Sequence, residues 1–281
     1  MNKIVLTGST NPYVNLAAEE YLMDRFDGRP IMYLWQNANT IVIGRTQNAY
    51  RECRVREFEE DGGFLARRST GGGAVYHDLG NLNFSFICSR QEYELSKNLR
   101  VILGAVRSFG IDAGFSGRND ILADGKKFSG NAFRHSAGAS LHHGTILFDA
   151  DMTKLSRYLQ PSAQKMESKG VKSVQSRVIN LKELNPQIDA ENLKRALIKS
   201  YIEVFGESEI FSAEELIPKG ELEPYVKKYS SWEWRLGENP QFNTEKSARY
   251  NFGEITYMLD VKACRIKQAR VYSDALNSDF I

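Results

Sequence analysis

The sequence stretch that decides the fold is RRSTGGGAVYHDLGN, residues 67–81. The apolar residues 64–66 before it predict a short buried strand, and residues 75–76 predict the start of another. Three successive glycines let backbone N–H groups approach an anion closely and adopt positive φ angles. Arg67-Arg68 adds forked donors that suit carboxylate or phosphate, and His77 lies beyond the turn. The stretch therefore predicts a rigid loop between two strands that binds a small polyanion.

A glycine-rich hairpin with solvated arginines is the alternative, because short motifs have many false positives. Two standard nucleotide-binding motifs do not fit the stretch. The phosphate loop GxxxxGK[ST] requires Lys-Ser or Lys-Thr after the glycines, and GxGxxG requires a following helix, whereas a strand follows here. The loop therefore matches neither of these two nucleotide-binding patterns.

The composition is that of an ordinary globular protein, with 42% hydrophobic and 26% charged residues among 281. Such a chain can bury one large core and a smaller appendage. A formal net charge of +2 gives no reason to expect a nucleic-acid partner. Without a signal peptide or an apolar run of about 20 residues, we expect no membrane partner and a cytoplasmic location. Three separated cysteines, Cys53, Cys88 and Cys264, predict reduced thiols.

The first part of the chain alternates predicted strands and helices around one sheet. Strands are expected at residues 3–6, 31–35, 40–44 and 81–88, and helices from Pro12, over 51–60 and over 95–109. We expect the strands at 31–35 and 40–44 to form a hairpin through residues 36–39. The first helix is interpreted as purely structural.

A second group of candidate residues follows. Asp124-Gly125 between apolar runs predicts a hairpin, which places Asp120 and Lys127 on neighbouring strands. His142 and His143 lie in another strand, where adjacent side chains point to opposite faces, so at most one of them faces a given pocket. No nearby spacing completes a zinc site. A carboxylate, a lysine and a histidine can converge here, with a solvated lysine turn as the alternative.

Residues 159–177 are polar and basic, without clear periodicity. A loop of this length in a compact domain is usually a lid or disordered. The basic side chains Lys165, Lys169, Lys172 and Arg177 suit a lid that closes over phosphates. A mobile surface loop without a binding role is the alternative.

The C-terminal part changes character after a proline-rich region. The expected elements are helices at residues 189–205 and 212–216, then strands at 248–252, 254–260 and 264–272. Pro218, Pro224 and Pro240 mark the boundary. We therefore divide the chain into a catalytic domain, residues 1–240, and a small C-terminal domain, residues 241–281.

With these motifs in this order, the chain resembles the lipoate-protein ligase A family, relatives of the biotin-protein ligases. The resemblance rests on NLAAEE, LWQNANTIVIGRTQN, RRSTGGGAVYHDLGN, GRND, KKFSG, HHGT, KGVKSVQSRV and RVYSDAL. It implies an α+β fold of mixed sheets flanked by helices. It also implies a C-terminal domain that reorients between two half-reactions. Here that domain starts and stops early, so we expect it to be shortened, truncated or completed by another polypeptide.

The resemblance implies that lipoate reacts with ATP to give lipoyl-AMP and pyrophosphate. The lipoyl group is then transferred to a lysine of lipoyl domains, in E2 subunits of 2-oxoacid dehydrogenases and in the glycine cleavage H protein. Lys127 is the implied catalytic residue, as an electrostatic stabiliser and not as a nucleophile. Asp120 is the implied ligand of Mg²⁺, and residues 159–178 are the implied adenylate-binding loop.

The other implied site residues fall into two sets. The ATP and adenylate site consists of Arg68, Gly73, Ala74, Val75, Tyr76, Asn119, Asp120, Lys127, Lys169, Arg177 and Val178. The lipoate site consists of Trp35, Arg68, Gly72, Gly73, His77, Lys127, Arg134 and His143.

Several alternative functions are weighed against this one. A lipoyltransferase that uses preformed lipoyl-AMP is favoured only by the short C-terminal domain. An octanoyltransferase needs a nucleophilic thiol near the pocket, and no cysteine lies between Cys88 and Cys264. Biotin ligation requires a different glycine-rich pattern. A non-catalytic lipoyl-domain binder would lack Lys127 or the central loop, and both are present.

Overall fold

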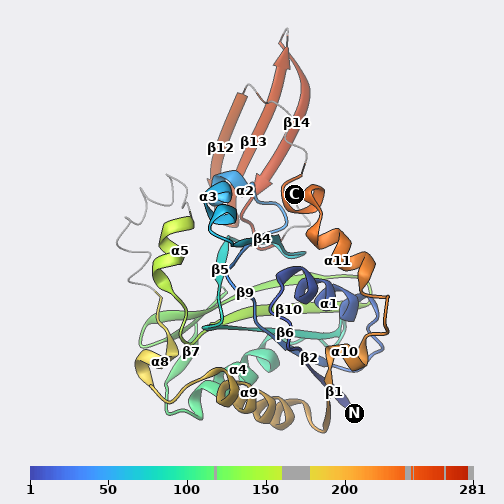
Figure 1. Cartoon of the computed structure of the whole chain (residues 1–281), viewed down its shortest axis with the longest axis vertical. Helices are drawn as coiled ribbons and strands as arrows, with labels where there is room; N and C mark the ends of the chain where they lie inside the picture. Colours follow the sequence, from blue (N-terminus) through green and yellow to red (C-terminus); the bar gives the residue numbers. More distant parts are fainter. Residues whose placement is uncertain (117–118, 160–177, 238–241, 243, 263, 278–281) are drawn as a thin grey trace.

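The computed structural model describes residues 1–116, 119–159, 178–237, 242, 244–262 and 264–277. Within these residues the chain forms an eight-stranded mixed sheet, two three-stranded sheets and helices around them (Figure 1). This is the α+β architecture of mixed sheets and flanking helices that the sequence predicted.

The large sheet contains β1 (Asn2–Leu6), β2 (Ile31–Trp35), β6 (Asn81–Ser89), β7 (Ala113–Phe115), β8 (Asp120–Ala123), β9 (Lys126–His135), β10 (Ala139–Leu147) and β11 (Ser208–Ser212). Their order is β11-β1-β2-β6-β10-β9-β8-β7. β1 pairs in parallel with β11 and β2, and the other neighbours are antiparallel. The predicted hairpin at Asp124-Gly125 is confirmed, because β8 and β9 pair across it.

Helices cover both faces of the large sheet. α4 (Leu95–Arg107) and α9 (Ala190–Phe205) pack together on one face, and α1 (Pro12–Asp24) packs with α11 (Glu223–Ser230) on the other (Figure 1). The Asn11 side chain caps α1 by accepting the Tyr13 N–H, as predicted. The shorter helices are α5 (Met152–Tyr158), α8 (Leu181–Leu184), α10 (Ala213–Leu216) and α12 (Trp232–Arg235). Among the helices described, none combines the length and apolarity of a membrane span.

The predicted hairpin of residues 31–35 and 40–44 is wrong. β3 (Thr40–Ile43) does not pair with β2 but is the central strand of a second sheet, between β4 (Phe64–Arg67) and β5 (Val75–His77). Every residue of β2 and of β3 is buried. Each strand is therefore covered on both faces, as expected for an interior strand. The buried Asn15 amide donates to Gln36 O at 2.8 Å and so holds the segment 36–39 that connects the two strands.

The single helix predicted at residues 51–60 is also wrong, because it is broken in two. α2 (Ala49–Glu52) and α3 (Val55–Glu60) flank Cys53, which is extended and forms an isolated β-bridge with Leu159. Cys53 and Val55 are both buried. Burying both of these side chains, together with the bridge, breaks the charged helix that the sequence pattern indicated.

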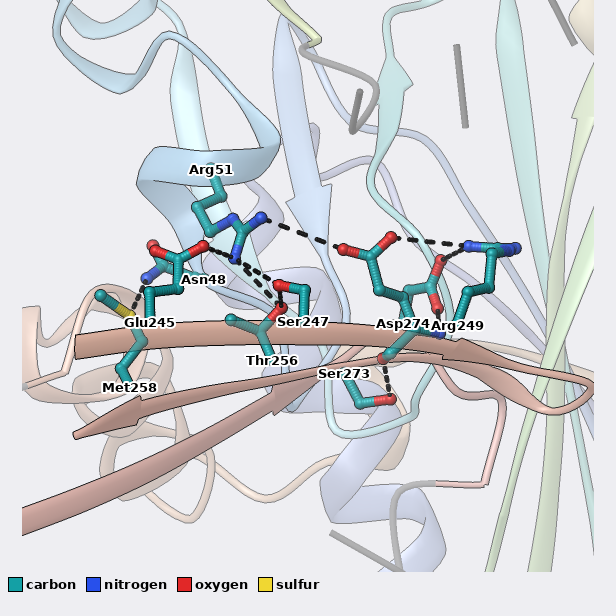
Figure 2. A network of polar contacts seen from close by, with 10 residues as sticks. Asn48, Arg51, Glu245, Ser247, Arg249, Thr256, Met258, Ser273 and Asp274 are labelled. Carbon is teal, nitrogen blue, oxygen red and sulfur yellow. Dashed lines mark hydrogen bonds and ion pairs between the residues drawn. The ribbon is translucent and has the colours of Figure 1, made fainter. Parts of the chain in front are cut away.

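The third sheet consists of β12 (Thr244–Tyr250), β13 (Gly253–Lys262) and β14 (Arg265–Ser273), in that order. The three predicted strands are thus present. Figure 2 shows polar side chains of this sheet facing α2, where Arg51 donates to Glu245 at 2.6 Å and to Thr256 at 3.1 Å. The Ser273 N–H donates to Thr46 O at 2.7 Å. The domain boundary at 240/241 stays a prediction.

The segment after β14 packs on the glycine loop. The Gly72 N–H donates to Ala275 O at 2.8 Å. A Cβ at Gly71 would lie 2.3 Å from Ala275 O and 2.5 Å from Leu276 O. Gly71 is therefore a residue that backbone packing requires, because two main-chain carbonyls cannot move aside as a flexible side chain can.

Replacing Gly71 by alanine should loosen this contact. We expect Gly71→Ala to lower the free energy of unfolding by about 1–3 kcal/mol, as overpacking does, and to speed amide exchange over residues 265–276. Gly73→Ala is the matched control, because a Cβ there meets no atom within 4 Å. Its expected effect is below about 0.5 kcal/mol. Equal exchange rates in the two variants would contradict the packing role.

His142 lies in the core beneath the large sheet, on the face that α4 and α9 cover. Its ring packs on Phe84, Phe86 and Phe133, with centroid distances of 5.5, 5.8 and 4.8 Å. Its Nε2 donates to Asn131 Oδ1 at 2.8 Å. Burial, and to a lesser extent the neighbouring His143, lowers the pKa of His142 to about 3. His142 is therefore neutral in the native state.

This depressed pKa predicts a loss of stability in mild acid. The unfolded state binds a proton near pH 6.5 that the native state does not bind until about pH 3, so stability falls as the pH drops through that window. Between pH 7 and pH 5.5 the loss through His142 should be about 1 kcal/mol. Urea unfolding at both pH values should show this loss in the wild type and less of it in His142→Asn. An unchanged difference between the two pH values would contradict the assignment.

Candidate active site

A cavity of about 150 Å³ lies between the large sheet and the glycine loop. Strands β2, β6, β9 and β10 supply one wall, and the loop with β5 supplies the facing wall. The lining residues are Leu16, Trp35, Val42, Arg68, Gly72, Gly73, Ala74, Val75, His77, Asn83, Asn119, Lys127, Gly130, Asn131, Ala132, His143, Gly144, Thr145 and Leu276. Basic, amide and aromatic groups thus meet in one cavity.

Most of the site residues implied by the sequence are brought together here. Those that line the cavity are Trp35, Arg68, Gly72, Gly73, Ala74, Val75, His77, Asn119, Lys127 and His143. Asp120 and Val178 do not line it, but both contact Lys127. The Tyr76 side chain packs instead among Ile41, Ile43 and Phe58.

Of three further residues, only Arg134 is described, and it lies elsewhere. Arg134 lines a second cavity, with Tyr93 and Phe133, and forms an ion pair with Glu20 at 3.0 Å. Lys169 and Arg177 lie outside the described residues, as does most of the predicted lid at 159–177 with Lys165 and Lys172. The placement of the lid over phosphates therefore stays a prediction.

Arg67 is a structural residue. Its guanidinium is buried and donates to the main-chain carbonyls of Gly44, Arg45, Gln47, Trp234 and Arg235 at 2.7–3.2 Å. Burial lowers the Arg67 pKa to about 10. The alternative of solvated arginines beside a glycine-rich hairpin is therefore wrong for this residue, and so is its expected use as an anion donor.

Arg68 holds the glycine loop from inside. Its guanidinium donates to the carbonyls of Val42, Gly71 and Gly73 at distances of 2.7–3.2 Å. Burial lowers the Arg68 pKa to about 10, and the buried carboxylate of Glu19 partly offsets that shift. Arg68 thus fixes the shape of the loop while its side chain still forms part of the cavity wall.

A buried polar network connects this arginine to the large sheet. Arg68 Nε donates to Thr70 Oγ1 at 3.1 Å, and Thr70 Oγ1 lies 2.8 Å from His143 Nε2. His143 Nδ1 lies 2.8 Å from Glu19 Oε1. Ser85 donates to the same carboxylate oxygen and accepts from Trp35 Nε1 at 3.0 Å. Six residues from four elements and the loop are therefore held in fixed orientations.

Glu19 was missed by the sequence analysis, which treated its helix as structural. Its side chain is 1% exposed, and it sits on the face of α1 that packs on the sheet. An acidic residue among the apolar positions of a buried helix face is the signal that could have identified it, because such a group requires a partner.

Lys127 reaches the cavity from the start of β9. Its Nζ forms an ion pair with Asp120 Oδ1 on β8 at 2.7 Å. The prediction that these residues lie on neighbouring strands is confirmed. A Cβ at Gly130 would lie 2.9 Å from Lys127 Nζ, so the missing side chain leaves room for the ammonium group. Ile179 N donates to Lys127 O at 2.9 Å, which attaches the chain after the predicted lid to this lysine.

His77 and Asn131 complete the polar part of the cavity. Asn37 Nδ2 lies 3.3 Å from His77 Nδ1, which places the ring proton on Nε2. Burial first, then Arg68 and His143, lower the His77 pKa to about 3, so the ring is neutral. Asn131, which sequence reasoning missed, binds the Asn119 carbonyl through its Nδ2 at 3.0 Å and its N–H at 2.9 Å. It therefore fixes the predicted nucleotide-binding asparagine.

The cysteines do not contribute to this cavity. Cys53 and Cys88 are buried, Cys264 is exposed, and none belongs to the residues described as lining it. Burial raises the pKa of Cys53 to about 12 and that of Cys88 to about 11. Neither buried thiol is activated as a nucleophile, which argues against the octanoyltransferase alternative. No group of three metal-binding side chains occurs in the part of the chain that the structure describes.

Comparison with known proteins agrees with this geometry. Two protein-family models match: the lipoyl protein ligase A/B catalytic domain over residues 11–202, and the bacterial lipoate protein ligase C-terminus over residues 239–281. The chain is 41% identical over 288 residues to a lipoate-protein ligase A from Psychrobacter cryohalolentis, covering 99% of this chain and 85% of that protein.

Solved structures of similar proteins include three that contain lipoate, a lipoyl domain or ATP. P. falciparum LipL1 in complex with lipoate is 31% identical, with a TM-score of 0.87, covering 100% of this chain and 87% of that one. The bipartite lipoate protein ligase of Thermoplasma acidophilum with its E2 lipoyl domain is 29% identical, with a TM-score of 0.74 over 85% and 97% of the chains. A lipoate-protein ligase A bound with ATP is 27% identical, with a TM-score of 0.72 over 84% and 98%.

The resemblance inferred from the motifs is thus confirmed along the whole chain. The chain belongs to the lipoate-protein ligase A family and is a lipoate-protein ligase.

Proposed function

We propose that this chain performs both half-reactions of lipoate ligation at the cavity below the glycine loop. A lipoate carboxylate oxygen attacks the α-phosphorus of ATP, the bond to the bridging oxygen breaks, and pyrophosphate leaves. The amine of an acceptor lysine then attacks the lipoyl carbonyl, and AMP leaves. The observation that carries this proposal is the Lys127 ammonium in the cavity wall, oriented by Asp120 at 2.7 Å.

Lys127 is the proposed catalytic residue because both steps build negative charge. Two anions must approach each other in the first step, and a positioned ammonium group offsets their repulsion. Lys127 lines the same cavity as the loop residues Gly72 and Gly73. Besides Lys127, the proposed nucleotide contacts are Arg68, Gly73, Ala74, Val75, Tyr76, Asn119, Asp120, Lys169, Arg177 and Val178. The proposed lipoate contacts are those that line this cavity: Trp35, Arg68, Gly72, Gly73, His77, Lys127 and His143. Arg134 is left out of this set, because it lines the second cavity.

Mg²⁺ is proposed to arrive with ATP. Asp120 is a single carboxylate and already pairs with Lys127. A donor set of one carboxylate suits Mg²⁺, which is commonly bound by one or two carboxylates together with substrate phosphates. Asp120 would hold the ion beside the phosphates, where it would neutralise their charge.

The proposed acceptors are lipoyl domains of E2 subunits and the glycine cleavage H protein. The T. acidophilum ligase structure contains an E2 lipoyl domain, which supports this class of partner. We propose residues 1–240 as the catalytic domain and 241–281 as the C-terminal domain. We place the reaction in the cytoplasm, where unpaired thiols such as Cys53 and Cys88 remain reduced.

The test is lipoate-dependent exchange of labelled pyrophosphate into ATP, with Mg²⁺ and no acceptor protein. We expect exchange by the wild type and a loss of about 100- to 1,000-fold in Lys127→Ala, the range typical for removing a stabilising donor. Lys126→Ala is the matched control, because the neighbouring lysine of β9 does not line the cavity and should retain activity.

Two outcomes would revise the proposal. Equal exchange by the two lysine variants would remove Lys127 from the chemistry. If the wild type shows no exchange but transfers the lipoyl group from supplied lipoyl-AMP to a lipoyl domain, the chain is a transferase and the ATP step is absent.

A further inference from the structure

Two polar atoms of the cavity wall are buried and have no partner. Among the described residues that line the cavity, His77 Nε2 and Asn83 Nδ2 are buried side-chain nitrogens without a hydrogen-bond acceptor. Asn83 is 1% exposed and His77 is 3% exposed. An unpaired buried N–H is unfavourable, so such atoms beside a binding cavity indicate a ligand acceptor.

The two residues are neighbours around Trp35. Asn83 on β6 lies opposite Trp35 on β2, and the His77 ring stands edge-on to the Trp35 ring at 6.3 Å. Both side chains are fixed by their other polar atom. Asn83 Oδ1 accepts from Asn81 Nδ2 at 3.0 Å, and His77 Nδ1 accepts from Asn37. The unpaired N–H groups are therefore held in place.

Asn83 lies about the length of an acyl chain from Lys127. The sheet register aligns Asn83 with Thr145 on β10, and Gly130 on β9 donates its N–H to the Thr145 hydroxyl at 3.2 Å. Two strand spacings separate Asn83 from Gly130, on the order of 10 Å. Lys127 Nζ lies beside Gly130. An extended eight-carbon acyl group with its carboxyl at Lys127 would thus end beside Asn83 and Trp35.

We infer that Asn83, with His77, determines acyl specificity by donating N–H groups to the ring sulfurs of lipoate. The inference rests on the proposed function, because it takes the acyl chain to run from Lys127 towards Trp35. A sulfur of the cyclic disulfide of lipoate is a weak acceptor, whereas the end of a saturated octanoyl chain accepts nothing. Octanoate therefore leaves both donors unpaired, and a site built around donors disfavours a ligand that lacks the acceptor.

The test measures binding and does not require turnover. Calorimetric titration of the full chain with lipoate and with octanoate, without ATP, gives the ratio of the two Kd values. We expect the wild type to prefer lipoate, and Asn83→Leu to reduce that preference about tenfold, mainly by tighter octanoate binding. Asn83→Ser keeps a donor and should retain most of the preference, which covers the case that the leucine variant does not fold.

Asn98→Leu is the matched control. Asn98 on α4 is also buried and also has an unpaired amide nitrogen, but it does not line the cavity, so its variant should leave the ratio unchanged. An unchanged ratio in Asn83→Leu, or an equal loss for both acids, would overturn the inference. Because no ATP is present, failure of the ligase chemistry would appear only in the exchange assay and would not alter this result.

Discussion

The buried Arg68 guanidinium determines the shape of the site. Moving this charge out of water costs several kcal/mol unless acceptors surround it. The carbonyls of Gly71 and Gly73 supply them, at 2.7 and 2.8 Å from Nη2. Carbonyl and N–H of a trans peptide group point in opposite directions, so these two contacts turn the N–H groups of Gly72 and Ala74 away from the arginine. The Gly72 N–H accordingly donates to Ala275. One side chain inside the loop therefore sets the outward direction of its amides.

The same charge requires the rest of the molecule to assemble around it. Glu19 on α1 is the buried carboxylate that offsets Arg68, through His143 on β10 and Thr70 on the loop. Removing one partner of such a network leaves an uncompensated buried charge, at a cost of about 3–5 kcal/mol. Helix, sheet and loop are thus coupled by polar contacts that tolerate little displacement. This coupling explains how a loop of three glycines can be held in one conformation.

Features that depend on neighbouring residues were predicted well from the sequence, whereas the assignment of strands to sheets was not. The cap at Asn11, the hairpin at Asp124-Gly125 and the three C-terminal strands depend on neighbouring residues, and all are confirmed. The hairpin of 31–35 with 40–44 failed because two adjacent apolar strands can enter different sheets, and only long-range packing decides which. In the site, Lys127 and Asp120 were found from a turn signal. Asn83 and Asn131 belong to no recognised motif, and only the strand register places them in the cavity wall.

Glycine occurs at the three loop positions for different physical reasons. Gly71 is required by packing, since any side chain would meet the carbonyls of Ala275 and Leu276. Gly72 has a φ of 93°, which side chains disfavour. Gly73 has neither constraint: no atom of the described residues lies within 4 Å of a Cβ there, and its φ is not positive. Yet Gly73 lines the cavity beside Arg68. Among the described residues, packing and backbone strain do not require glycine at this position, whereas the proposed approach of a substrate to the loop backbone would require it.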